Sequence, residues 1–232
     1  MRPRGSTGWI IIIAVILLAG GAFLWFHEWN PARSERAYAT QLLAESVKAS
    51  ARPKAILVIG NPFADAPNRP ADVAQFESSG IAGLRAGFAG IPLKVGHPKI
   101  KSSILADPTA IQIDPNSPTP LSFIVESAAF DELIKANPDC DVVVSLIGLP
   151  VNLSAMETWT RPGSPRFALL LPDWRMVGDG SAIEKAFTSG KLVAAVVTLR
   201  SSADVDPKQR YQVINPSNVV ETLRGSPTLF GL

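Results

Sequence analysis

Amide, carboxyl, hydroxyl and aromatic side chains follow three apolar runs of the sequence, at the points where each run ends. The candidate ligand-binding residues are Asn61, Phe63, Asp173, Trp174 and Ser201. In an open parallel sheet, ligands gather beyond the carboxyl ends of the strands, so these residues favour a cleft for a small polar molecule. Gly, Pro, Asn and Asp are also the ordinary residues of turns, and an indole can pack in the core, so structural roles are the alternative.

Motifs for nucleotide binding, metal binding and acyl transfer are missing from the sequence. The glycines within residues 80–87 lie in a helix-like segment that follows no strand, so they predict close helix packing and not a phosphate-binding loop. His97 and Cys140 lie in unrelated segments without metal-ligand spacing. No Gly-x-Ser-x-Gly elbow presents a serine to His97, and Ser145 falls inside an apolar run, where we expect a packed hydroxyl. We therefore expect no catalytic residue, no metal and no cofactor, and enzyme activity is disfavoured.

Short apolar runs alternate with helix-like segments through the last three quarters of the chain. The runs occupy residues 55–59, 92–96, 141–147, 167–171, 192–199 and 211–214, and the helices are expected at about 71–89, 127–137, 180–189 and 217–224. The runs are continuous and rich in β-branched residues, which is typical of strands covered on both faces. The pattern predicts a single three-layer α/β sandwich with a mostly parallel sheet, and residues 111–113 and 121–125 could add edge strands.

Residues 9–26 form an apolar run of 18 residues without a charged side chain. A helix of that length spans roughly 27 Å, close to the hydrocarbon thickness of a bilayer. Tryptophans at both ends are typical of an interfacial aromatic belt. Arg2 and Arg4 would also suit a cleaved signal peptide, but the run continues beyond the small residues 20–22. We therefore expect an uncleaved transmembrane helix ahead of the α/β domain.

The expected organisation is a tail at residues 1–8, a transmembrane helix at 9–29, a juxtamembrane helix and linker at 30–52, and an α/β domain at 53–232. Asn30 and Pro31 are typical of a helix start. A short tail ahead of the first apolar helix usually stays in the cytoplasm. The N-terminus is therefore expected in the cytoplasm and the C-terminal domain on the periplasmic or extracellular side, with the lipid bilayer as a partner.

The charge of the chain excludes some partners. The 22 basic and 20 acidic residues give a net charge of +2 and are scattered along the sequence. Nucleic-acid binding needs basic residues gathered on one patch or stripe, so no nucleic-acid partner is expected. The single cysteine, Cys140, excludes an intramolecular disulfide and leaves the compartment open.

Four segments carry a resemblance to a known family. They are the first strand at 55–60, the helix at 82–88, a later strand at 141–147, and a closing strand and helix at 211–219. Together they resemble a type 1 periplasmic-binding-protein domain. This resemblance implies an α/β fold and a sugar or related small polar solute as the ligand. The chain is too short for two complete lobes and has the predicted N-terminal anchor, and both differences argue against capture of a solute by lobe closure.

Three functions fit these observations. The leading one is a non-enzymatic, membrane-tethered extracytoplasmic domain that binds a small polar solute or a partner protein. The alternative is an accessory subunit of a larger membrane complex, because the small residues at 19–22 could pack on other membrane helices. The third is a diverged hydrolase, which requires His97 to lie within hydrogen-bond reach of a serine and a carboxylate.

Overall fold

The computed structural model describes residues 31–67, 69–107, 112–199 and 206–231. The predicted transmembrane helix at 9–29 and the candidate residue Ser201 lie outside these ranges. Among the described residues, none of the helices combines the length and the apolar character needed to cross a bilayer.

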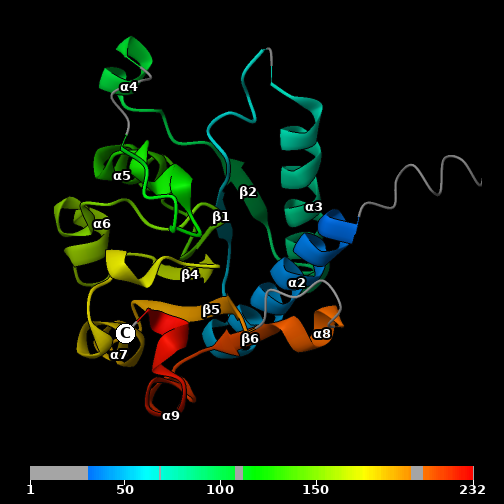
Figure 1. The fold of residues 1–232 in the computed structure, drawn as a ribbon, viewed down its shortest axis with the longest axis vertical. Helices are drawn as coiled ribbons and strands as arrows, with labels where there is room; N and C mark the ends of the chain where they lie inside the picture. Colours follow the sequence, from blue (N-terminus) through cyan, green and yellow to red (C-terminus); the bar gives the residue numbers. More distant parts are fainter. Residues whose placement is uncertain (1–30, 68, 108–111, 200–205, 232) are drawn as a thin grey trace, which may run out of the picture.

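Six strands form one mixed sheet with the order β2-β1-β3-β4-β5-β6 (Figure 1). The strands are β1 (Ile56–Ile59), β2 (Leu93–Gly96), β3 (Val142–Ser145), β4 (Arg166–Leu170), β5 (Leu192–Thr198) and β6 (Tyr211–Ile214). Neighbouring strands are parallel from β2 to β5, and β6 runs antiparallel to β5. The predicted mostly parallel sheet is confirmed, with every strand within two residues of its expected bounds.

The register of the parallel strands brings their carboxyl ends to one edge of the sheet. Ile59 pairs with both Gly96 and Ser145, and Ser145 pairs with Leu169. We call this side, where β1 to β5 end, the carboxyl edge, and the opposite side, where they begin, the amino edge. Each connection from a strand end therefore starts at the carboxyl edge, and each return helix ends near the amino edge.

Helices cover both faces of the sheet, as the continuous apolar strands predict. On one face α2 (Pro31–Ala51) and α3 (Ala71–Gly87) pack against side chains such as Val58 and Val144. The other face is covered by α5 (Ser127–Lys135), α6 (Glu157–Thr160), α7 (Gly180–Thr188) and α9 (Val219–Gly225). The short helices α4 (Ser102–Ala106) and α8 (Pro207–Arg210) lie outside these layers (Figure 1). The predicted three-layer sandwich is therefore confirmed for the described residues.

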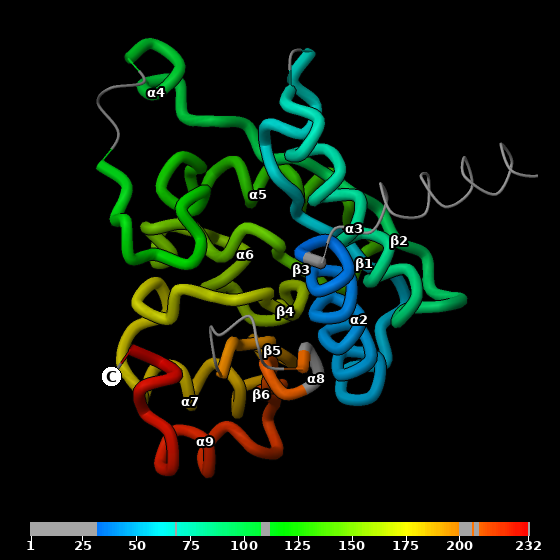
Figure 2. Tube along the Cα trace, turned by 45° about the vertical axis from the view of Figure 1, so that its right-hand side comes forward, coloured from blue at the N-terminus to red at the C-terminus, as the bar shows by residue number. Residues whose placement is uncertain are grey.

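Helices α2 and α3 lie side by side at van der Waals distance (Figure 2). A Cβ atom added at Gly83 would lie 2.0 Å from the carbonyl oxygen of Ala37, and one added at Gly87 would lie 2.6 Å from the Cβ of Ala44. The prediction that these glycines permit close helix packing is confirmed. Most of the segment 30–52, which we expected to link an anchor to the domain, is α2 (Pro31–Ala51), and the buried face of this helix, which includes Leu43, belongs to the domain core.

The segment after α4 differs from the expected edge strands. Residues 120–123 form a 3₁₀ helix, Pro120–Phe123, and Val125 alone makes an isolated antiparallel bridge, to Ile100. The strand predicted at 121–125 is therefore wrong. Proline has no backbone N–H to give to a sheet, and its fixed φ suits the first turn of a helix.

Candidate functional site

The chain leaves β1 and β3 in opposite directions, although the two strands are neighbours. β1 leads through α3 to β2 on one side of the sheet, and β3 leads through α6 to β4 on the other. Ligands of open α/β sheets bind in the crevice that such a reversal leaves at the carboxyl edge. A cavity of about 350 Å³ opens at this point, which we call the switch cavity. Its lining consists of Arg33 and Arg36 of α2, Asp72, Val73, Phe76 and Glu77 of α3, Asn61, Leu146 and Ile147 beyond the strand ends, and Pro118, Thr119, Pro120 and Leu121.

Arg36 brings a guanidinium group to the wall of the switch cavity. Its Cζ lies 4.2 Å from the centre of the Phe76 ring, which is a cation–π distance. Its Nε is buried and has no hydrogen-bond partner among the described residues. Burial lowers the pKa of Arg36 to about 10, against the charges of Glu77 and Tyr211, which raise it. The group stays a cation at neutral pH and has a free hydrogen-bond donor.

Thr119 provides a second unpaired polar atom on the same cavity. Its backbone is fixed, because its N–H donates to Ser117 Oγ and its carbonyl accepts from Ser122 Oγ at 2.7 Å. Its own hydroxyl is buried and makes no hydrogen bond within the described part of the chain. Gly148, with φ +79°, leaves room for this side chain, since a Cβ there would lie 2.6 Å from the Thr119 hydroxyl oxygen.

A buried carboxylate closes the cavity toward β1. Glu77 Oε1 lies 2.6 Å from His97 Nε2, and its Oε2 accepts a hydrogen bond from the Asn61 backbone N–H. The other imidazole nitrogen, Nδ1, lies 2.5 Å from Asp65 Oδ2. Burial alone would lower the pKa of His97, but the hydrogen bonds and charges of Glu77 and Asp65 outweigh it, so the pKa is raised. Gly60 is needed for this contact, because a Cβ there would lie 2.1 Å from Glu77 Oε1.

The size and mixed chemistry of the switch cavity suit a small molecule. Ligand pockets commonly enclose about 300–1,000 Å³, with apolar walls and a few convergent polar groups. Phe76, Leu146 and Ile147 supply the apolar wall, and Arg36 and Thr119 supply the unpaired polar atoms. No group of three or more metal-binding side chains occurs among the described residues.

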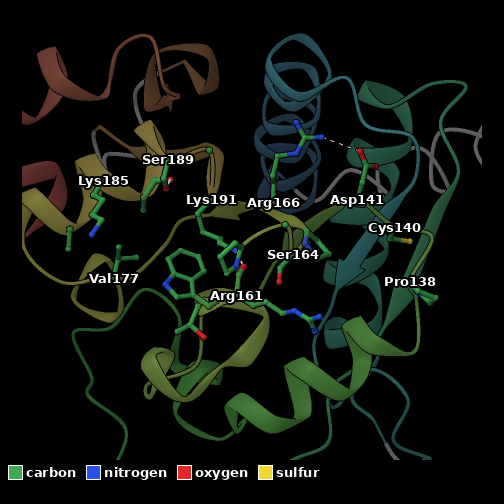
Figure 3. Close-up of a pocket in the computed structure, with 18 residues that line it drawn as sticks. Pro138, Cys140, Asp141, Arg161, Ser164, Arg166, Val177, Lys185, Ser189 and Lys191 are labelled. Atoms are coloured by element: carbon green, nitrogen blue, oxygen red, sulfur yellow. Dashed lines mark hydrogen bonds and ion pairs between the residues drawn. The ribbon is translucent and has the colours of Figure 1, made fainter.

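A larger groove of about 1060 Å³ lies at the amino edge, before β3, β4 and β5 (Figure 3). Its lining includes the cations Arg161, Arg166, Lys185 and Lys191 and one carboxylate, Asp141, so we call it the basic groove. Arg166 pairs with Asp141 at 3.1 Å, and Lys191 donates to the carbonyls of Thr158 and Arg161. Burial lowers the pKa of Lys191. None of the buried unpaired side-chain atoms of the described residues belongs to the lining of this groove.

Among the residues expected to bind a ligand, the structure places Asn61 in the wall of the switch cavity. Phe63 is exposed two residues further on, and its backbone N–H donates to Asn61 Oδ1. Their proposed ligand contacts stay predictions.

Asp173 and Trp174 follow β4 at the same edge but lie outside the lining of the switch cavity. Asp173 is buried and pairs with Arg175, which also contacts Asp114. The Trp174 ring packs between Phe187 and Phe230, with centroid distances of 6.1 and 5.2 Å. The Trp174 Nε1 is buried without a hydrogen-bond partner among the described residues, and the proposed ligand contacts of Asp173 and Trp174 stay predictions.

Three residues of the switch cavity escaped the sequence analysis: Arg36, Glu77 and Thr119. Arg33 and Arg36 stand three residues apart in a helix, so they share one face of α2, which was the available signal. Glu77 follows Phe76 in a polar stretch of α3, and Thr119 lies between two prolines. Neither pattern differs from ordinary surface sequence, so only the fold identifies them.

The geometry expected for a hydrolase is not formed around His97. Both ring nitrogens contact carboxylates, Asp65 and Glu77, so neither is left to activate a serine hydroxyl. Ser145 is fully buried and donates to the carbonyl of Gly148, as expected for a packed hydroxyl.

No family model and no curated protein matches the chain, whereas several solved structures are similar to it in fold. A carbohydrate transporter from Acidothermus cellulolyticus 11B, in complex with myo-inositol, matches with a TM-score of 0.50 at 11% identity, over 84% of this chain and 62% of that one. A periplasmic solute-binding protein from Actinobacillus succinogenes 130z with bound D-allose matches with a TM-score of 0.44, at 12% identity, over 81% and 62% of the two chains. A solute-binding protein from Mycobacterium smegmatis with bound glycerol gives 0.48, at 13%, over 82% and 61%.

The resemblance to periplasmic solute-binding proteins is therefore confirmed as a likeness of fold, which rests on the first of these structures. The chain spans less than two thirds of the length of each of them.

Proposed function

We propose that this protein is a membrane-tethered extracytoplasmic domain that binds a small polar solute in the switch cavity. One observation carries the proposal: Arg36 and Thr119 line the same cavity, and each has a buried polar atom, Nε and Oγ1 respectively, that is unpaired among the described residues. An unmade hydrogen bond of a buried polar group costs about 1–3 kcal/mol, so two such groups on one cavity indicate an occupant.

The two unpaired atoms suggest the chemistry of the solute. The Nε–H of Arg36 needs an acceptor, and the Thr119 hydroxyl can accept or donate. A polyhydroxylated molecule offers hydroxyl oxygens to both, and its C–H face can lie on the apolar wall formed by Phe76 and Ile147. The solved structures of similar fold contain myo-inositol, D-allose and glycerol, which have this character.

The solute would be enclosed by the single sheet and by the helices that pack on that sheet. The described strands all belong to a single sheet, and the switch cavity is walled by α2, α3 and residues 118–121. Binding then needs no closure of a second lobe. The apolar run at residues 9–26 supports the membrane tether, with the N-terminus in the cytoplasm and the domain on the periplasmic or extracellular side.

Titration calorimetry on the full chain in mild detergent tests this proposal. The probes are myo-inositol, D-allose and glycerol, followed by any small molecule that native mass spectrometry finds on the purified protein. We expect at least one to bind with a Kd below about 1 mM, and Arg36→Met to weaken it at least tenfold, because a hydrogen bond to a charged group contributes about 1.5–3 kcal/mol.

The control is Arg161→Met, which removes a cation from the basic groove and should leave the affinity unchanged. If no polyol or copurified molecule binds, or if the two arginine variants bind equally well, the switch cavity is not a solute site.

A further inference from the structure

The exposed large apolar side chains of the described residues lie on connections that follow strand ends or near the start of α3. Among the described residues, six large apolar side chains are exposed: Phe63, Phe76, Leu105, Ile113, Val151 and Leu199. Five of them lie on segments that follow a strand end, namely those after β1, β2, β3 and β5, and Phe76 lies in the second turn of α3. Five of the six therefore lie on connections that leave the carboxyl edge, and the sixth, Phe76, lines the switch cavity at that edge. Exposed apolar groups gathered on one surface mark a contact with a protein or a membrane.

The amino edge has a different surface. Its described loops include 52–55, 136–141, 161–165 and 189–191, which are rich in Arg, Lys, Asp, Ser, Pro and Gly. None of the exposed large apolar side chains lies on these loops. The connections at the carboxyl edge, such as residues 60–70, are longer than these amino-edge loops, and five of the six exposed apolar side chains lie on them.

The described chain also enters the domain at the carboxyl edge. α2 runs from Pro31 to Ala51, and a short connection leads from Ala51 directly to the start of β1 at the amino edge. The first turns of α2 are therefore at the carboxyl edge, where Arg33 and Arg36 line the switch cavity. Only residues 27–30 separate the apolar run from α2. Four residues span at most about 14 Å even when fully extended.

We infer that the carboxyl edge is docked on the lipid bilayer that holds the N-terminal run, with the six exposed apolar side chains at the headgroup level. The inference rests on the proposed membrane tether and goes beyond the proposed solute binding. A tether of four residues fixes the start of α2 next to the bilayer, and at such a high effective concentration weak apolar contacts suffice to orient the domain. The switch cavity then lies beside the headgroups, and a solute reaches it through the gap between domain and bilayer.

Site-directed fluorescence quenching on the full chain in phosphatidylcholine nanodiscs tests this orientation. The native cysteine, Cys140, is buried, and it is first replaced (Cys140→Ala) so that it does not compete for the label. A single cysteine is then introduced at each test position. Phe63→Cys and Val151→Cys report on the carboxyl edge, and Lys48→Cys and Ser189→Cys are matched exposed controls at the amino edge. We expect lipids with a spin label on the headgroup to quench the labels at 63 and 151 several-fold more than those at 48 and 189.

Equal quenching at the four positions, or stronger quenching at 48 and 189, would overturn the docked orientation. Calorimetry on the same nanodiscs keeps the two proposals apart, because a solute that still binds while the quenching pattern is absent refutes the docking alone. Release of the protein from the nanodiscs by an alkaline wash would refute the tether, and the docking with it. Weak quenching in nanodiscs, combined with protection of positions 63 and 151 from labelling in native membranes, would assign the edge to a protein partner instead.

Discussion

The two edges of the sheet carry cavities of opposite character. The basic groove at the amino edge has a volume of about 1060 Å³, three times that of the switch cavity at about 350 Å³. In the groove, Arg166 has a carboxylate partner and Lys191 donates to two carbonyls. In the smaller cavity, a guanidinium nitrogen and a hydroxyl are buried without partners among the described residues.

This contrast teaches that unmet hydrogen-bonding capacity is a better guide to a binding site than volume. A groove in which Arg166 and Lys191 already have partners gains little from a ligand that binds these two groups, because existing bonds must be exchanged for new ones. When a ligand pairs the buried unpaired atoms of a cavity, it removes the free-energy penalty of their missing hydrogen bonds, about 1–3 kcal/mol for each atom. The topology of the sheet points to the same edge, since the order of the strands reverses between β1 and β3.

The largest expected effect comes from separating α2 from α3, which removes one wall of the switch cavity. Gly83→Ala places a Cβ 2.0 Å from the carbonyl oxygen of Ala37, so the helices must move apart. We expect the free energy of unfolding to fall by about 3 kcal/mol, measured by denaturant titration in mild detergent. Gly225→Ala is the control, because a Cβ there meets nothing within 4 Å and should change stability by less than about 0.5 kcal/mol. A Gly83→Ala protein as stable as its parent would contradict the close packing of the two helices.

A pair of threonine variants compares an unpaired hydroxyl with a paired one. Thr158 Oγ1 donates to Asp131 Oδ1 at 2.6 Å, so Thr158→Val leaves a buried carboxylate short of a donor and should cost about 2 kcal/mol of stability. Thr119→Val removes a hydroxyl without a partner, so the ligand-free protein should keep its stability or gain up to about 1 kcal/mol.

Binding of the solute should reverse that order. Calorimetry should show affinity reduced about tenfold by Thr119→Val and unchanged by Thr158→Val, because only the first residue lines the switch cavity. Loss of ligand-free stability in Thr119→Val would mean that its hydroxyl already has a partner, and the argument from unpaired atoms would fail.

His97 makes the carboxyl edge sensitive to pH. Contacts with Glu77 and Asp65 raise its pKa above the ordinary 6.5, so the folded state holds the proton more tightly than the unfolded state. The resulting stabilisation is fully present below pH 6.5 and is lost as the pH rises through the raised pKa. Denaturant titrations across this range should show stability that declines with pH in the parent protein, and a smaller decline in His97→Gln. Parallel pH profiles for the two proteins would refute the coupling.

The smallest effect is expected at the amino edge. The pair of Arg166 with Asp141 is one third exposed on both side chains, and such pairs contribute little because water screens them. Arg166→Gln should therefore lower the free energy of unfolding by less than about 1 kcal/mol, which thermal unfolding can check. Solute affinity should stay unchanged. A tenfold loss of affinity in this variant would move the binding site to the basic groove.

The sequence predicts the sheet well because its strands are buried on both faces. Runs such as 192–199 have to be continuously apolar to fit between two helix layers, and their short length distinguishes them from the apolar run of 18 residues at 9–26. The 121–125 segment has the same β-branched and apolar residues, which favour a strand. Pro118 and Pro120 lack backbone donors for a sheet, however, and residues 120–123 form a 3₁₀ helix instead.

The candidate site was predictable only in part. Strand ends are visible in a sequence, so Asn61 could be placed at the carboxyl edge before the fold was seen. Arg36 and Thr119 come from segments that precede and follow β1, and only the tertiary packing of α2 and of residues 118–121 brings them to one cavity. Whether a hydroxyl is unpaired depends on every neighbour in space, which residue spacing along the chain does not encode.

The packing of α2 also has a consequence for the order of folding during synthesis. Ser50 Oγ at the end of α2 donates to the carbonyl of Val193 in β5, 143 residues later in the chain. The apolar face of α2 is therefore made early but cannot be fully covered until β5 has left the ribosome. Contacts so distant in sequence slow folding. A nascent chain that stalls before β5 would hold an uncovered amphipathic helix ready to associate with the wrong partner.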